Sequence, residues 1–302
     1  MLISEKIHRY LPETEIEIKT EKDVDSLGFI SSTGKSFCGF IGSAKYISDV
    51  SDDIKTLIIG REIKEQFSDD KVGLIISDKP QMLFWKLHQS MGKDSDYIRL
   101  EQNNRISGEA RIGKYVSIAD KNVVIEEGVV IEDFVTIYEN TYIGKNSIVR
   151  SGCRLGGVGF QECMIDDKIE TINHYGGVII GENVDIQNNS CIDRGLFPWD
   201  DTVIGDETKI DNMVHIAHAV SVGKRCEIAA NSVIAGRCKI GDNVWIGLGA
   251  LIRNFAVIGN DSRVNIGSVV VNDVPDGGNV TGNFAIDHNK FLYSQLRLNR
   301  IK

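Results

Sequence analysis

Read in sixes from Ile204, the sequence runs IGDETK, IDNMVH, IAHAVS, VGKRCE, IAANSV, IAGRCK, IGDNVW, IGLGAL, IRNFAV, IGNDSR, VNIGSV and VVNDVP. Ile or Val opens every hexad, and the fifth residue is small or β-branched. A helix would need apolar residues every three to four positions and a half-buried strand every two, so neither explains this period. A fixed period of six predicts a parallel β-helix, in which three hexads form one coil. The opening aliphatic residue and the compact fifth residue should point inward, with Gly or Asn supplying positive φ near the corners.

The repeat extends upstream of Ile204, with interruptions. Three hexads start at Ile106, and after one extra residue the pattern resumes at Ile125 and runs to Leu155. The polar segment 156–177 is too long for one side of a coil, so we expect a loop extruded from the β-helix. The hexads return at Ile180, and a smaller bulge is expected at 195–201. Long loops in compact domains tend to be functional, so both excursions are candidate pocket walls.

The remaining sequence predicts two further parts. Residues 1–100 lack the six-residue period and contain short β-rich runs and one amphipathic helix at 80–91, which predicts a small α/β domain. The β-helix should occupy 101–278. Residues 279–302 read as a turn-rich exit followed by a short helix. The predicted fold class is therefore β, a hexapeptide parallel β-helix with an N-terminal α/β domain and a C-terminal helix.

Composition restricts the function classes. The 302 residues carry a net charge of −9, which argues against a general nucleic-acid-binding face. The six cysteines are scattered and lack a CxxC pair, so we interpret them as buried thiols in a reducing compartment. Neither a signal peptide nor a long apolar segment is evident, so we expect a cytoplasmic protein without membrane insertion.

Two histidines lie together in DNMVHIAHAV. His218 is third in its hexad, which should place it on the outer wall, where a neutral imidazole is a plausible general base. His215 precedes it near a corner. A hydrogen-bonded surface histidine is the plainer interpretation for either residue. Metal binding by the HxxH pair is a third, disfavoured because partner acids and cysteines are not nearby in the sequence.

Glycines and aromatic residues suggest places for a ligand. Gly236, Gly247 and Gly249 recur on the wall near His218, where missing side chains would leave a slot for a long, thin ligand; alternatively, they serve only the corners. In FIGSAKY, the rings of Phe40 and Tyr46 could sandwich a flat base, or they could belong to a small-domain core.

With these features, the chain resembles a known family. CIDRG at 191–195, the segment TVIGDETKIDNMVHIAHAVSVG and the spacing of FIGSAKY are similar to the UDP-3-O-(3-hydroxyacyl)glucosamine N-acyltransferases of lipid A synthesis. The resemblance covers most of the chain. The IDRG and DNxVxIAH motifs are its specific part, because many unrelated acyltransferases share the hexads.

This resemblance implies a left-handed β-helix, a homotrimer and active sites in the grooves between subunits. His218 would be the catalytic base. The amine of the acceptor and the thioester of the donor would meet at this residue. The resemblance implies a nucleotide-linked amino sugar as acceptor and acyl-CoA or acyl carrier protein as co-substrate. It implies no bound cofactor and no metal. The other implied site residues are Phe40, Ser43, Tyr46, Asp193, Asn212 and His215 for the sugar nucleotide, and Ala235, Gly236 and Gly247 for the acyl donor.

Three departures from the family pattern bear on the substrate. Ser43 replaces an Asn beside the uracil, Phe255 replaces a second His, and the sequence ends at Lys302, where the lipid A enzyme continues into another helix. These changes fit acylation of another nucleotide-linked amino sugar from a short acyl-CoA, while lipid A synthesis from acyl carrier protein stays open. A scaffold or a zinc-dependent, carbonic-anhydrase-like β-helix protein is the alternative class.

Overall fold

The computed structural model describes residues 1–67, 71–282, 285 and 287–298. The chain forms two compact units. Unit 1 comprises 1–103, 158–177 and 194–201, and unit 2 comprises 104–157, 178–193 and 202–302. The predicted α/β domain thus gains both excursions from the repeat, so it is discontinuous in sequence.

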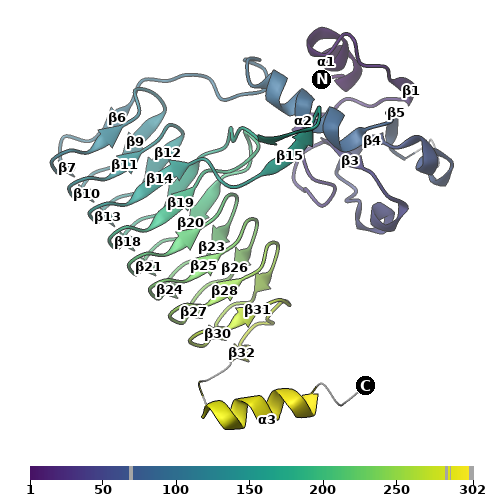
Figure 1. Ribbon diagram of the computed structural model, residues 1–302. Helices are drawn as coiled ribbons and strands as arrows, with labels where there is room; N and C mark the ends of the chain where they lie inside the picture. The colour runs from purple at the N-terminus through teal and green to yellow at the C-terminus, as the bar shows by residue number, and fades with distance from the viewer. Residues whose placement is uncertain (68–70, 283–284, 286, 299–302) are drawn as a thin grey trace. The chain divides into compact units, whose positions relative to one another are not determined.

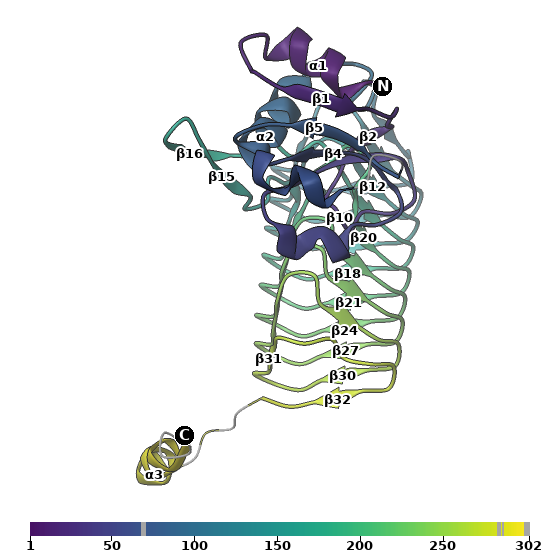
Figure 2. The ribbon, with the colours of Figure 1, turned by 90° about the vertical axis from the view of Figure 1, so that its right-hand side faces the viewer.

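Unit 2 is a left-handed parallel β-helix with three flat faces, and its coils appear as stacked rungs in Figures 1 and 2. Each face is a parallel sheet in which every strand pairs with the equivalent strand one coil away. The first face contains β6 (Arg105–Ile106), β9 (Val123–Ile125), β12 (Thr141–Ile143), β17 (Val178–Ile180), β20 (Thr202–Ile204), β23 (Ser221–Val222), β26 (Lys239–Ile240) and β29 (Val257–Ile258).

The other two faces follow the same order along the chain. The second face contains β7 (Arg111–Ile112), β10 (Val130–Ile131), β13 (Ile148–Val149), β18 (Asp185–Ile186), β21 (Lys209–Ile210), β24 (Glu227–Ile228), β27 (Trp245–Ile246), β30 (Arg263–Val264) and β32 (Asn279–Val280). The third face contains β8 (Ser117–Ile118), β11 (Thr136–Ile137), β14 (Arg154–Gly157), β19 (Cys191–Asp193), β22 (His215–Ile216), β25 (Val233–Ile234), β28 (Leu251–Ile252) and β31 (Val269–Val270).

The interior follows the hexad rule. Each opening Ile or Val from Ile204 to Val270 is buried, and so is each fifth residue from Thr208 to Val274. The buried fifth-position hydroxyls of Thr208, Ser232 and Ser262 donate to backbone carbonyls, as where the Thr208 hydroxyl donates to the Gly223 oxygen over 2.9 Å. The predicted inward positions are therefore confirmed.

The expectation that Gly or Asn would supply positive φ at the corners is confirmed in part: Asn231, Asn243 and Gly249 do so, but other residue types do as well. In the hexads that open from Ile204 to Val264 the left-handed residue is the fourth, and these residues include Met213 (φ 59°), Ala219 (φ 57°) and Phe255 (φ 64°). Glycine is instead common at the second position, for packing reasons: a Cβ on Gly205 would lie 2.5 Å from the backbone of Gly223 in the next coil. Close approach between coils, rather than φ, selects glycine there.

Unit 1 contains a five-stranded sheet in the order β1 (Glu17–Thr20), β5 (Gly73–Ile76), β4 (Ile54–Ile59), β3 (Phe37–Ile41) and β2 (Ser26–Leu27). Only the β1–β5 pairing is antiparallel among these strands. The helical elements of this unit are α1 (Ile3–Tyr10), η1 (Ala44–Asp49), η2 (Arg61–Gln66) and α2 (Pro80–Met91). Pro80 begins α2 at the position where a missing N–H costs nothing.

The two excursions complete the core of unit 1. Residues 158–177 carry an antiparallel hairpin, β15 (Glu162–Ile165) and β16 (Lys168–Thr171). In the second excursion, Phe197 and Trp199 stack with their rings 5.8 Å apart, and the Trp199 indole N–H donates to the Leu27 oxygen over 2.9 Å. Both expected loops do leave the β-helix, but they form structure that the sequence did not indicate.

The predicted C-terminal helix is present as α3 (His288–Leu298), while residues 299–302 lie outside the described part of the chain.

Candidate active site

His218 lies directly after β22, at the corner that ends the third face. Only 8% of it is exposed. Its imidazole occupies the space where Gly236, one coil further on, lacks a side chain: a Cβ there would lie 2.7 Å from both Cε1 and Nε2. The Arg237 N–H donates to the His218 carbonyl over 3.0 Å, which fixes the backbone of this coil. Gly236 therefore accommodates the ring, so the expected open slot is filled at this position.

His215 and Asp193 form a second feature of the same face. Their strands, β22 and β19, pair in adjacent coils. His215 Nε2 lies 3.6 Å from Asp193 Oδ2, beyond hydrogen-bonding distance. Burial raises the pKa of Asp193 to about 7 and lowers the pKa of His215, and each shift favours the neutral form. These shifts are those of two desolvated groups rather than of a formed ion pair.

Asn212 lies at the other end of β22 from His218, before the strand begins. Its Oδ1 accepts hydrogen bonds from the backbone N–H and side-chain amide of Asn188, at 3.1 and 3.0 Å. Its own amide group donates to Asp211 over 2.7 Å. Asn212 thus spans neighbouring coils, and its predicted contact with substrate stays a prediction.

The three residues predicted for the acyl donor occupy different environments. The Ala235 N–H donates to the Ile252 oxygen over 3.0 Å, so it is committed to the ladder between coils. The Gly236 N–H has no such bond among the described residues and remains the candidate donor to an oxyanion. A Cβ on Gly247 would lie 2.6 Å from the Ile266 nitrogen, so this glycine is explained by coil stacking.

Phe255, at the position where the resemblance implies a second histidine, lies at a corner one coil beyond Gly236. Its N–H donates to the Gly236 oxygen over 3.0 Å, and its side chain is exposed. The structure therefore offers no imidazole at this corner. Among the described residues, no group of three His, Cys, Asp or Glu side chains is arranged to hold a metal ion.

Phe40, Ser43 and Tyr46 line one cavity of about 550 Å³ in unit 1. The Phe40 ring packs on Phe84 at 4.9 Å, so part of it belongs to the core. Tyr46 is exposed, and the Lys45 ammonium lies 4.6 Å from its ring centroid. The structure thus brings the predicted base-binding residues together around a space large enough for a small ligand.

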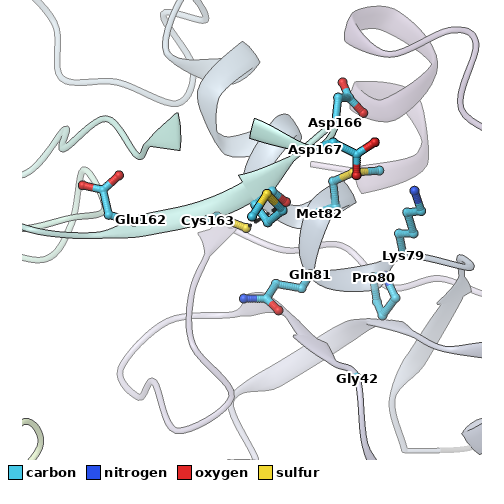
Figure 3. A pocket seen from close by; sticks show the side chains of 10 residues that line it. Gly42, Lys79, Pro80, Gln81, Met82, Glu162, Cys163, Asp166 and Asp167 are labelled. Atoms are coloured by element: carbon cyan, nitrogen blue, oxygen red, sulfur yellow. Dashed lines mark hydrogen bonds between the residues drawn. The ribbon is translucent and has the colours of Figure 1, made fainter. Parts of the chain in front are cut away.

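A second cavity, of about 530 Å³, lies between the start of α2 and the β15–β16 hairpin (Figure 3). It shares Gly42 and Gln81 with the first cavity. Both hairpin-turn residues, Asp166 and Asp167, have positive φ, as a two-residue turn of this kind requires. The sequence analysis missed this wall, although the DD pair between two short β-rich runs was a usable hairpin signal.

Comparisons with known proteins match the coils that carry these residues. The family model described as bacterial transferase hexapeptide (six repeats) matches residues 122–157 and 201–236. A UDP-3-O-acylglucosamine N-acyltransferase of Delftia acidovorans is 37% identical over 139 residues, which is 46% of this chain and 41% of the relative. The corresponding protein of Bordetella pertussis is 33% identical over 149 residues, covering 48% and 40%.

Solved structures give the same fold. The crystal structure of a UDP-N-acetylglucosamine O-acyltransferase from Moraxella catarrhalis matches with a TM-score of 0.55 and 26% identity, over 64% of this chain and 74% of that one. A Francisella novicida UDP-N-acetylglucosamine acyltransferase matches with a TM-score of 0.54 at 24% identity, over 64% and 70%, and supports the fold alone.

The described helices include none that is both long and apolar enough to cross a bilayer.

The chain spans about two fifths of the length of the relatives it matches, 41% and 40%. Within that span, the hexapeptide coils containing Asn212, His215, His218 and Gly236 lie inside the matched family model. The expected resemblance is confirmed: the chain is similar to the hexapeptide acyltransferases, and to the UDP-3-O-acylglucosamine N-acyltransferases among them.

Proposed function

We propose that this protein is an N-acyltransferase that moves an acyl group from a thioester to the amino group of a nucleotide-linked amino sugar. The observation that carries the proposal is the imidazole of His218 held against Gly236, in coils that match the transferase hexapeptide model. The named N-acyltransferase relatives support the reaction type.

The chemistry follows from these two residues. The sugar amine attacks the thioester carbonyl, so a C–N bond forms and the C–S bond breaks. His218 takes a proton from the attacking nitrogen and returns it to the departing thiolate. The Gly236 N–H is proposed to donate to the oxygen that becomes negative in the tetrahedral intermediate.

Acceptor binding is assigned to unit 1. The cavity around Phe40, Ser43 and Tyr46 offers ring faces for a nucleobase, with Lys45 as a cation near the phosphates. His215, Asp193 and Asn212 of unit 2 are proposed to contact the sugar. The proposed acyl donor is an acyl-CoA or an acyl carrier protein, and Gly247 is a proposed contact of that donor. We further propose that the enzyme acts as a homotrimer in the cytoplasm. It is proposed to work without a bound cofactor.

The test is thioester release by the purified protein with UDP- and dTDP-linked amino sugars and with acetyl-CoA, hydroxybutyryl-CoA and hydroxymyristoyl carrier protein as donors. His218→Ala should lower turnover by about two to four powers of ten, the usual scale for losing a general base. His8→Ala, which removes an exposed histidine of α1, is the matched control and should keep full turnover.

Native mass spectrometry of both variants checks that assembly is unchanged. Turnover with a CoA donor would indicate a short acyl substrate. Turnover only with carrier protein and UDP-3-O-acylglucosamine would indicate lipid A synthesis. Full activity of His218→Ala would refute the assignment of His218 as the base. If the wild-type protein released no thiol with any combination of donor and acceptor, the proposed function would be refuted.

A further inference from the structure

Gly157 is a glycine that neither backbone conformation nor packing requires. It ends β14 and pairs with Asp193 of β19 in the next coil. Its φ is not left-handed, unlike that of Gly156, which has φ 85° and forms the bulge before this pair. Among the described residues, a Cβ on Gly157 would have only two atoms within 4 Å: Asp193 Oδ1 at 3.8 Å and Tyr138 Cε2 at 4.0 Å. Both are ordinary contact distances, so an alanine would fit.

Most glycines in the coils differ from Gly157 because the fold explains them. A Cβ on Gly181, Gly205 or Gly241 would lie at most 2.8 Å from a backbone atom of the next coil, and Gly249 has a left-handed φ of 64°. Gly157 has neither reason, and it lies on the outer surface of the third face, half-buried. A missing side chain at such a position lets another molecule approach the backbone closely.

The two side chains beside Gly157 carry groups that suit a sugar. Tyr138 directly follows β11 in the preceding coil; it is 40% exposed, and its N–H donates to the Leu155 oxygen over 2.9 Å. Its ring offers an apolar surface to the C–H groups of a ligand. On the other side, Asp193 Oδ2 lies 3.6 Å from His215 Nε2, while Oδ1 is the oxygen nearest to the missing Cβ of Gly157. A carboxylate oxygen accepts hydrogen bonds from hydroxyl groups.

The space beside Gly157 is also close to His218. The strands β14, β19 and β22 occupy successive coils of the third face, and His218 directly follows Ala217 at the end of β22. Neighbouring strands lie about 4.8 Å apart, so about 10 Å separates β14 from β22. A sugar ring with its hydroxyl and amino groups can span this separation.

The following inference rests on the proposed function. We propose that the sugar ring of the acceptor lies over Gly157, between Tyr138 and Asp193, with its amino group directed towards His218. Gly157 is then a specificity-determining residue, because any side chain there would occupy part of the space that the sugar ring needs. The nucleobase stays assigned to the cavity around Phe40 and Tyr46.

The first test is steady-state kinetics of Gly157→Ala. The KM for the nucleotide-linked amino sugar should rise tenfold or more, the scale on which one extra methyl group in a binding site is felt. The KM for the acyl donor should stay unchanged. The melting temperature should not fall, since an alanine that fits its site mainly restricts the unfolded chain.

Gly108→Ala is the matched control. A Cβ on Gly108 would meet nothing within 4 Å among the described residues, its φ is not left-handed either, and it lies in the first coil, away from β19 and β22. This variant should keep wild-type kinetics. An unchanged acceptor KM in Gly157→Ala would overturn the inference. So would a lower melting temperature with equal losses towards both substrates, because that result would make Gly157 purely structural.

Tyr138 offers a second variant pair. Tyr138→Leu removes the ring and should raise the acceptor KM roughly two- to tenfold, whereas Tyr138→Phe keeps the ring and should stay near the wild-type value. Equal acceptor KM values in these two variants would contradict a contact between this ring and the sugar.

A binding measurement separates this inference from the proposed function, because it needs no turnover. In calorimetric titrations the wild type should bind UDP-glucosamine more tightly than UDP, and Gly157→Ala should lose most of this difference while its affinity for UDP stays unchanged. Equal wild-type affinities for the two ligands would overturn the sugar site. If this binding pattern appeared in a protein without any turnover, the sugar site would be supported and acyl transfer alone would be refuted.

Discussion

In unit 2, Ile216, Ile234 and Ile252 succeed one another down the third face, each one coil from the last. In unit 1, Phe84, Ile172 and Phe197 reach a single cluster from distant parts of the chain. The first kind of core repeats one local rule, and each coil contacts mainly its neighbours. The second is assembled once, from three segments that must all be in place. The stability of the two units should therefore respond differently to similar core substitutions.

The largest effect is expected at Phe197, which is fully buried and contacts Trp85, His88 and Trp199. Phe197→Ala should cost about 3–5 kcal/mol, because the ring leaves a cavity where several segments meet. Urea unfolding followed by tryptophan fluorescence should show unit 1 losing stability while the far-UV signal of the β-helix keeps its midpoint.

Phe160→Ala is the control for Phe197→Ala, since Phe160 is exposed and its loss should change stability by less than about 0.5 kcal/mol. An equal drop in both transitions would mean that the two units unfold as one and would remove the contrast.

The next effect comes from His88, which joins α2 to the first excursion. Its Nε2–H donates to the Asn173 oxygen and its Nδ1 accepts from the Tyr97 hydroxyl, both at 2.8 Å. Burial lowers its pKa to about 4 from the usual 6.5. The neutral ring therefore stabilises unit 1 fully above pH 6.5, and this contribution is lost as pH falls from 6.5 towards 4. The difference corresponds to roughly 3 kcal/mol.

The free energy of unfolding of unit 1, measured between pH 7.5 and 4.5, should fall more steeply in the wild type than in His88→Gln. The unfolding transition of the β-helix should not show this loss of stability at low pH. Parallel pH slopes in the two proteins would show that His88 does not titrate in this way.

The smallest effect is expected from shortening one buried side chain in a single coil of the β-helix. Ile234→Val removes one methylene from a fully buried position and should cost about 0.5–1.5 kcal/mol. Because the coils form a linear array, faster amide exchange should be confined to the strands beside it, β22 and β28. Faster exchange as far away as β10 would contradict this local response.

The sequence predicted the β-helix well because its period reports one local geometry, and every opening residue from Ile204 to Val270 proved to be buried. It could not predict the core of unit 1. Nothing in the residues around Phe197 or Ile172 indicates that they pack with α2, since these contacts join segments with no shared pattern. The corners were predicted only in part: Asn231 and Gly249 have the expected positive φ, but coil geometry imposes it on Met213 and Phe255 as well.

The candidate site, too, was predicted from the sequence only in part. The motifs singled out His215 and His218, which lie at the start of β22 and at the corner after it, and the FIGSAKY residues Phe40, Ser43 and Tyr46, which line one cavity. The sequence did not show that Gly236 makes room for an imidazole or that Asp193 Oδ2 lies 3.6 Å from His215 Nε2. Those facts depend on contacts between coils, which a repeat pattern leaves unspecified.

The chain passes between the two units after residues 103, 157, 177, 193 and 201. No single stretch of gene encodes unit 1, and a fragment cut after Asn103 would lack Ile172, Phe197 and Trp199 from its core. Recombination between relatives therefore has no clean boundary at which to exchange unit 1, the proposed acceptor-binding part, as a cassette. We expect acceptor preference in such proteins to diversify by substitutions around the cavity rather than by shuffling of whole modules.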